Sequence, residues 1–125
     1  MAVTMLEHVN IRTPDLEATR RFFIDVIGLE EGPRPNFAFP GAWLYCGGVP
    51  VVHLIGDGGR PPRQGSGAVD HVAFGAADYE GFVAKLSARG VPHQVRDVPG
   101  QRIRQVFVHD PNGVKVEINF RLDGG

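Results

Sequence analysis

Three histidines and one glutamate occupy corresponding positions in the two halves of this 125-residue chain: His8, His53, His71 and Glu117. His53 interrupts the apolar run PVVHLIG (residues 50–56), where an imidazole needs either a hydrogen-bond partner or a function. Imidazole and carboxylate both bind divalent transition metals, and four such ligands leave two positions of a six-coordinate ion open. The residue set therefore predicts a catalytic metal site for Zn, Ni, Co, Mn or Fe.

An internal repeat relates these residues to one another. The segments LEHVNIRTPDLEATRRFF (6–23) and VDHVAFGAADYEGFVAKL (69–86) align without a gap. Each half then reads as one strand, one helix and three shorter strands. We therefore expect an α+β fold of two tandem βαβββ modules within one domain, with module one over residues 1–60 and module two over residues 68–123.

The expected elements follow from hydrophobic periodicity and from turn residues. Helices should begin near Asp15 and Asp78 and end at Gly28 and Gly90, where glycine accepts a left-handed conformation. The stretch GDGGRPPRQGSG (56–67) should link the modules. The strands are expected over residues 4–12, 29–37, 41–46, 50–56, 69–75, 92–98, 103–109 and 114–120.

Strand alternation predicts which side chains share a face of each sheet. The apolar residues can pack on the helix, while the four candidate ligands face the open side. Trp43, Tyr45 and Phe107 fall on the same open faces and are candidate walls of a substrate pocket. Arg104 is a candidate for binding a substrate carboxylate or phosphate. The competing interpretation is that the histidines are hydrogen-bonded structural residues and that the aromatic rings are core packing.

Composition and charge argue against several classes of protein. The formal net charge is −1 and the basic residues form no cluster, so we expect no binding to nucleic acid or to an anionic membrane. No apolar run approaches the ~20 residues that span a bilayer, and the N-terminus lacks a signal-peptide pattern. Cys46 is the only cysteine, so no internal disulfide can form, and we expect a cytoplasmic protein.

The chain resembles the vicinal oxygen chelate superfamily, which includes glyoxalase I, extradiol dioxygenases and bleomycin-binding proteins. The resemblance is carried by LEHVNIRTPDLEATRRFFIDVIGL at the start, VDHVAF in the middle and FVHDPNGVKVEI near the end. It implies that the modules curve into a barrel-like mixed sheet around a metal, completed across a homodimer. The ligands that it implies are His8, His53, His71 and Glu117.

The same resemblance implies a lyase or isomerase acting on a small carbonyl or hydroxy-acid substrate. The metal would stabilise an enolate or oxyanion, and Glu117 would be the catalytic base. His53 stands where glyoxalase I and the epimerases usually carry Glu or Gln. Glu117 is therefore the only carboxylate of the set, and no cofactor other than the metal is expected.

Two other functions stay open. An extradiol-type Fe(II) dioxygenase would use His8, His71 and Glu117, but that branch carries a tyrosine ten residues before its glutamate ligand, where this chain has Phe107. A further ligand at His53 would also occupy a position that catechol and oxygen need. The third function is a small-molecule (drug) binding and sequestering protein in which the histidines are structural.

Overall fold

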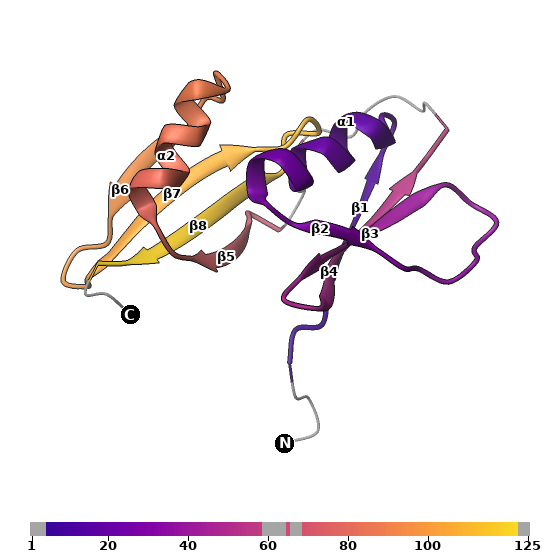
Figure 1. Cartoon of the computed structure of the whole chain (residues 1–125), viewed down its shortest axis with the longest axis horizontal. Helices are drawn as coiled ribbons and strands as arrows, with labels where there is room; N and C mark the ends of the chain where they lie inside the picture. Colours follow the sequence, from indigo (N-terminus) through magenta and orange to yellow (C-terminus); the bar gives the residue numbers. More distant parts are fainter. Residues whose placement is uncertain (1–4, 59–64, 66–68, 123–125) are drawn as a thin grey trace. The chain divides into compact units, whose positions relative to one another are not determined.

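The chain folds into two compact units, Met1–Arg63 and Gln64–Gly125, in a computed structural model (Figure 1). The structure describes residues 5–58, 65 and 69–122. Most of the predicted linker at 56–67 lies outside the described residues, as does the predicted start of the first strand at residue 4. Each unit contains one four-stranded mixed sheet and one helical region.

The first unit has the strand order β1-β4-β3-β2, with β1 parallel to β4 and the remaining pairs antiparallel. A short α-helix continues into a π-helical segment before the second strand. The elements are β1 (Val9–Thr13), α1 (Leu16–Arg21), η1 (Phe22–Ile27), β2 (Glu30–Gly32), β3 (Gly41–Cys46) and β4 (Val49–Gly56).

The second unit repeats this topology with the strand order β5-β8-β7-β6, again with one parallel pair, β5 and β8. The predicted tandem βαβββ arrangement is therefore confirmed. The closure of the two sheets into a barrel across a dimer stays a prediction. The elements are β5 (Val72–Ala76), α2 (Tyr79–Ala88), β6 (Gln94–Asp97), β7 (Ile103–His109) and β8 (Lys115–Arg121).

Strand β2 is shorter than the predicted 29–37 because two prolines follow it closely. Pro33 and Pro35 have no N–H to donate to a sheet, and each restricts the backbone of the residue before it. The strand consequently ends at Gly32. The predictions for β3 and β7 match the structure residue for residue.

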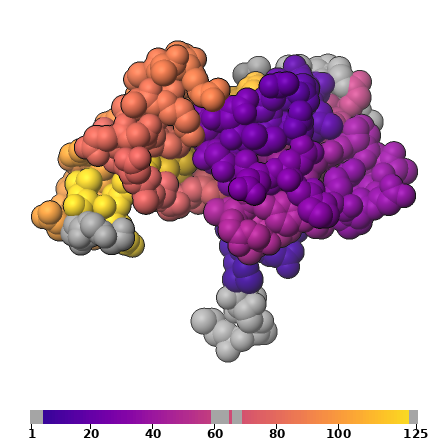
Figure 2. Space-filling model, viewed as in Figure 1, coloured from indigo at the N-terminus to yellow at the C-terminus, as the bar shows by residue number. Residues whose placement is uncertain are grey.

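Both helical regions begin and end as the sequence predicts. The Asp15 carboxylate accepts a hydrogen bond from the Ala18 N–H (3.0 Å), and Asp78 caps α2 in the same way. Gly28 ends the first helical region with φ 96°. Figure 2 shows that each helix keeps a solvent-facing side, with α1 in indigo. No described helix is long and apolar enough to span a membrane.

The core of each unit lies between its helix and one face of its sheet. In the first unit Phe23, Leu44 and Val52 are fully buried. In the second unit the rings of Tyr79 and Phe82 on α2 pack on Phe120 of β8, with 5.6 Å between ring centroids in both pairs. The helix therefore covers one face of the sheet, and strand alternation leaves the other face to the candidate ligands.

Candidate functional site

His53 lies in a stack of three rings on the open face of the first unit. Its ring centroid is 3.7 Å from that of His8 and 4.0 Å from that of Trp43, with an interplanar angle of 12° in both pairs. Trp43 is the β3 partner of His53, and His8 directly precedes β1 on the other side of β4. The structure thus brings two predicted ligands and one predicted pocket residue together.

The His53 imidazole is buried and favours the neutral form. Only 8% of its surface is exposed, and its Nε2 lies 3.1 Å from the Pro50 carbonyl oxygen. Burial lowers the pKa of His53, and the neighbouring His8 lowers it further. When Nε2–H donates a hydrogen bond to the Pro50 carbonyl, the lone pair on Nδ1 can bind a metal or accept a hydrogen bond.

His71 and Glu117 form the corresponding pair in the second unit. His71 directly precedes β5, and Glu117 lies on the neighbouring strand β8 with 8% of its surface exposed. The His71 Nε2 is 3.2 Å from the Glu117 Oε1. Two donor atoms that each bind one metal at about 2.1 Å lie at most about 4.2 Å apart, so this pair fits a shared ion.

An acidic residue directly precedes His8 and His71 and orients each ring. The Glu7 Oε1 is 3.0 Å from the His8 Nδ1, and the Asp70 Oδ2 is 2.8 Å from the His71 Nδ1. When Nδ1–H donates a hydrogen bond to the carboxylate, the lone pair of Nε2 can bind a metal, as is usual for metal-binding histidines. The hydrogen bond to His71 lowers the pKa of Asp70, and the charge of Lys115 adds to this effect. The alignment of Glu7 with Asp70 in the repeat was the sequence signal for this role.

A chain of side-chain hydrogen bonds holds the second Glu117 oxygen. The Asn119 Nδ2 donates to the Glu117 Oε2 (2.9 Å), the Gln105 Nε2 donates to the Asn119 Oδ1 (3.2 Å), and the Arg96 Nη2 donates to the Gln105 Oε1 (3.3 Å). Arginine can only donate and an ionised carboxylate can only accept, so every bond in this chain runs in the same direction. The chain therefore fixes the orientation of the Glu117 carboxyl group.

Two of the other predicted pocket residues lie on the open faces of their sheets. Phe107 is the β7 partner of Glu117 and is largely buried. Tyr45 lies on the same face of β3 as Trp43. Its ring lies over Gly32, where an added Cβ would come within 2.7 Å of the ring. The Tyr45 hydroxyl donates to the Pro33 carbonyl, so it is engaged with the backbone.

Arg104 lies on the opposite, helix-covered face, and the structure does not bring it to Phe107 and Glu117. Its guanidinium donates twice to Asp97 (2.6 and 3.1 Å) and lies 5.0 Å from the ring centroid of Tyr79 on α2. Residues 104 and 107 are three apart on one strand, so they point to opposite faces. Alternation alone could have shown that Arg104 does not line this pocket.

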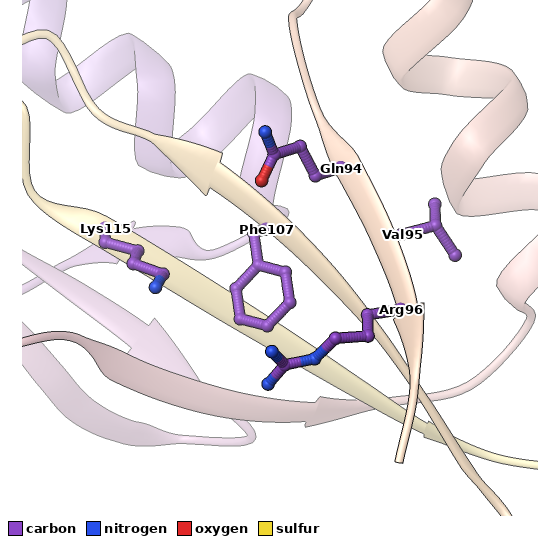
Figure 3. Close-up of a pocket in the computed structure, with 5 residues that line it drawn as sticks. All are labelled: Gln94, Val95, Arg96, Phe107 and Lys115. Atoms are coloured by element: carbon purple, nitrogen blue, oxygen red, sulfur yellow. The ribbon is translucent and has the colours of Figure 1, made fainter. Parts of the chain in front are cut away.

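A hollow of about 460 Å³ surrounds Phe107 on the open face of the second sheet (Figure 3). The Lys115 ammonium and the Arg96 guanidinium lie 5.0 and 5.5 Å from the centroid of the Phe107 ring. In Figure 3 both cationic groups approach this ring, whereas Val95 points away from it. The lining residues are Gln94, Val95, Arg96, Phe107 and Lys115.

Each unit brings one pair of the predicted ligands together. Among the described residues no three His, Cys, Asp or Glu side chains lie close enough to hold one metal ion. His8 and His53 are adjacent in the first unit, and His71 and Glu117 are adjacent in the second. The convergence of all four residues on one ion stays a prediction.

The chain belongs to the Glyoxalase/Bleomycin resistance protein/Dioxygenase superfamily, whose family model matches residues 5–118. It is 28% identical over 118 residues to lactoylglutathione lyase of Haemophilus influenzae, covering 88% of this chain and 87% of the relative. It is 26% identical over 122 residues to Glyoxylase I 4 of Arabidopsis thaliana, covering 93% and 70% of the two chains.

Solved structures with the same fold include a glyoxalase family protein and an antibiotic binding protein. A glyoxalase family protein from Bacillus anthracis superposes with a TM-score of 0.78 and 24% identity, covering 97% of this chain and 98% of the other. TnmS3, an antibiotic binding protein from Streptomyces sp. CB03234, superposes with a TM-score of 0.72 and 17% identity over the same shares. At these identities the structural likeness shows the fold alone.

Proposed function

We propose that this protein is a metal-dependent, glyoxalase-like lyase or isomerase that acts on a small carbonyl or hydroxy-acid substrate. The observation that carries the proposal is the His71–Glu117 pair, whose donor atoms are 3.2 Å apart on an open sheet face. Asp70 contacts the other ring nitrogen of His71, Nδ1, and Asn119 donates a hydrogen bond to the other carboxyl oxygen of Glu117, Oε2. The name lactoylglutathione lyase, given to a relative, supports the same class of chemistry.

The proposed metal ligands are His8, His53, His71 and Glu117, and the ion is Zn, Ni, Co, Mn or Fe. When bound, a divalent metal polarises a substrate oxygen and stabilises the negative charge that develops there. The nitrogen and oxygen atoms fit this role, because the His8 and His71 rings are oriented by acids and burial lowers the pKa of His53, which favours its metal-binding neutral form. We further propose a homodimer in which each site takes one ligand pair from each subunit.

Glu117 is the proposed catalytic base. Its carboxyl group is oriented by the hydrogen bond from Asn119 and is largely buried on the open face of the sheet. It removes a proton from the carbon beside the substrate carbonyl, exchanges that proton with solvent, and returns one proton to the same carbon or to its neighbour, so that the number of atoms in the substrate is unchanged. Phe107, directly across the strand pair, provides an apolar wall beside the moving proton.

Exchange of the α-proton for deuterium tests this function directly. Metal-loaded protein in D₂O should exchange the α-proton of at least one compound from a panel of 2-oxo acids, 2-hydroxy acids and lactoylglutathione, measured by ¹H NMR. Glu117→Gln should slow the exchange by about 10²–10⁴-fold, whereas Glu80→Gln on the exposed side of α2 should not. Exchange at the wild-type rate in Glu117→Gln, or none with any compound, would contradict the proposal.

A small-molecule binding protein is the second candidate function, and the ring stack in the first unit favours it. Contacts with His8, Trp43 and the Pro50 carbonyl already satisfy much of the His53 side chain without a metal. In that case purified protein would hold no stoichiometric ion and would still bind an aromatic ligand. Loss of ligand binding after removal of a bound metal would instead favour the enzyme.

A further inference from the structure

We propose that the hollow around Phe107 is the carboxylate-binding part of the substrate site. The negatively charged group would bind between Arg96 and Lys115, and the apolar part of the same molecule would lie against the Phe107 ring. The proposal rests on the proposed function for the reaction that follows binding, and it narrows the substrate to a small carboxylic acid.

Strand register places this hollow directly beside the proposed base. Gln94, Phe107 and Glu117 face one another across β6, β7 and β8, so they form one row on the sheet. Lys115 lies two residues before Glu117 on β8, and Arg96 lies two residues after Gln94 on β6. Side chains two residues apart on a strand share a face, so both cations lie on the Glu117 face.

The positive charges of Arg96 and Lys115 are only weakly neutralised by carboxylates of the described residues. Arg96 donates to the neutral Gln105 amide, and among the described residues no carboxylate forms an ion pair with it. Lys115 lies 3.7 Å from Asp70, whose contacting oxygen is already 2.8 Å from His71. A bound carboxylate would supply the missing negative charge through charge-assisted hydrogen bonds.

The distances available on the sheet limit the size of the substrate. Directly paired side chains have Cβ atoms about 5 Å apart, so a molecule held at Phe107 has its next one or two carbons within reach of Glu117. A short 2-oxo or 2-hydroxy acid meets this requirement. A neutral carbonyl compound of the same size would bring no negative charge to Arg96 and Lys115.

Lactate and its neutral amide, lactamide, test the inference as a matched pair of probes. Dissociation constants would be measured by NMR titration of the full chain, both metal-loaded and after treatment with a chelator. Lactate should bind at least about tenfold more tightly than lactamide in both preparations. Arg96→Gln and Lys115→Met should each weaken lactate about tenfold or more and leave lactamide unchanged.

Arg102→Gln and Lys85→Met are the controls, because each makes the same substitution at an arginine or a lysine that does not line the hollow. Equal binding of lactate and lactamide, or equal weakening by the control variants, would overturn the inference. Lys115→Met keeps the test valid even where Arg96→Gln disturbs the chain to Glu117, because Lys115 is not part of that chain. A missing metal would overturn the proposed function, but the lactate preference in chelator-treated protein would still decide this inference.

Discussion

Asn119 holds the Glu117 carboxylate by a hydrogen bond of 2.9 Å, which makes it a sensitive residue of the second unit. Asn119→Asp would replace this donor with a second carboxylate beside the first. We expect the free energy of unfolding in urea at pH 7 to fall by about 1–3 kcal/mol, because a largely buried charge loses its donor and gains a like charge.

Asn36→Asp makes the same change of charge at an exposed position and is the matched control. It should leave the free energy of unfolding nearly unchanged. Equal effects of the two substitutions would mean that Asn119 does not orient Glu117.

The pKa of the Asp97 carboxyl tests whether Arg104 lies on the helix-covered face beside it. The hydrogen bonds from Arg104 lower the pKa of the Asp97 carboxyl. The pKa of Asp97 is lower in the folded state than in the unfolded state. The pair therefore stabilises the folded protein at pH values above the unfolded-state pKa, and this stabilisation is lost as the pH falls through the folded-state pKa. In ¹³C NMR titrations, Arg104→Gln should raise the Asp97 pKa toward its ordinary value, whereas Arg102→Gln should not. An unchanged Asp97 pKa in Arg104→Gln would contradict the placement.

Residue types and spacing predicted the ligand pairs but not what holds them. The alignment of His53 with Glu117 follows from the repeat, and alternation places both on the open faces. The chain from Arg96 through Gln105 and Asn119 combines residues from three strands, and such a combination depends on register. Register is set by turns and packing over the whole sheet, so sequence alone could not reveal this chain.

The start of α2 offers a prediction at the scale of one element. Asp78 adopts φ 65°, and its carboxylate lies so close to Gly81 that an added Cβ would clash with it. Gly81→Ala usually stabilises a helix, but here we expect the free energy of unfolding to fall because the capping carboxylate must move. In an Asp78→Gly background the same substitution should instead stabilise by about 0.5–1 kcal/mol.

Urea unfolding of the wild type, both single variants and the double variant provides this comparison as a double-mutant cycle. Stabilisation by Gly81→Ala in the wild-type background would show that the carboxylate does not restrict this position.

At the element scale, the predictions succeeded where glycine and alternation act locally, and they were wrong at β2, which Pro33 and Pro35 shorten. The helix ends at Gly28 and Gly90 and the strands β3 and β7 follow from the residues themselves. The π-helical turn over Phe22–Ile27 did not follow from the sequence, because the apolar stripe of Phe22, Phe23 and Val26 suits an ordinary α-helix equally well.

At the scale of the whole molecule, each compact unit holds one half of the proposed ligand set. A homodimer that shares ligands between subunits predicts complementation between two inactive variants. His53→Ala and Glu117→Ala, unfolded and refolded together in equal amounts, should regain about a quarter of the wild-type metal sites. Half of the dimers are then mixed, and one of the two sites in each mixed dimer is intact.

Each variant refolded alone is the control and should regain none of these sites. Metal content after gel filtration measures the outcome. If the mixture binds no more metal than the separate variants do, the ligands are not shared between subunits.

Elemental analysis of the purified chain shows whether His8, His53, His71 and Glu117 bind one divalent metal ion. We expect about one ion per chain and a loss of most of it in His8→Ala, His53→Ala, His71→Ala and Glu117→Gln. His93→Ala and His109→Ala, which remove the two remaining histidines, should keep the full amount. Absence of a stoichiometric ion from the wild type, or equal losses in all six variants, would show that these four residues do not form a metal site.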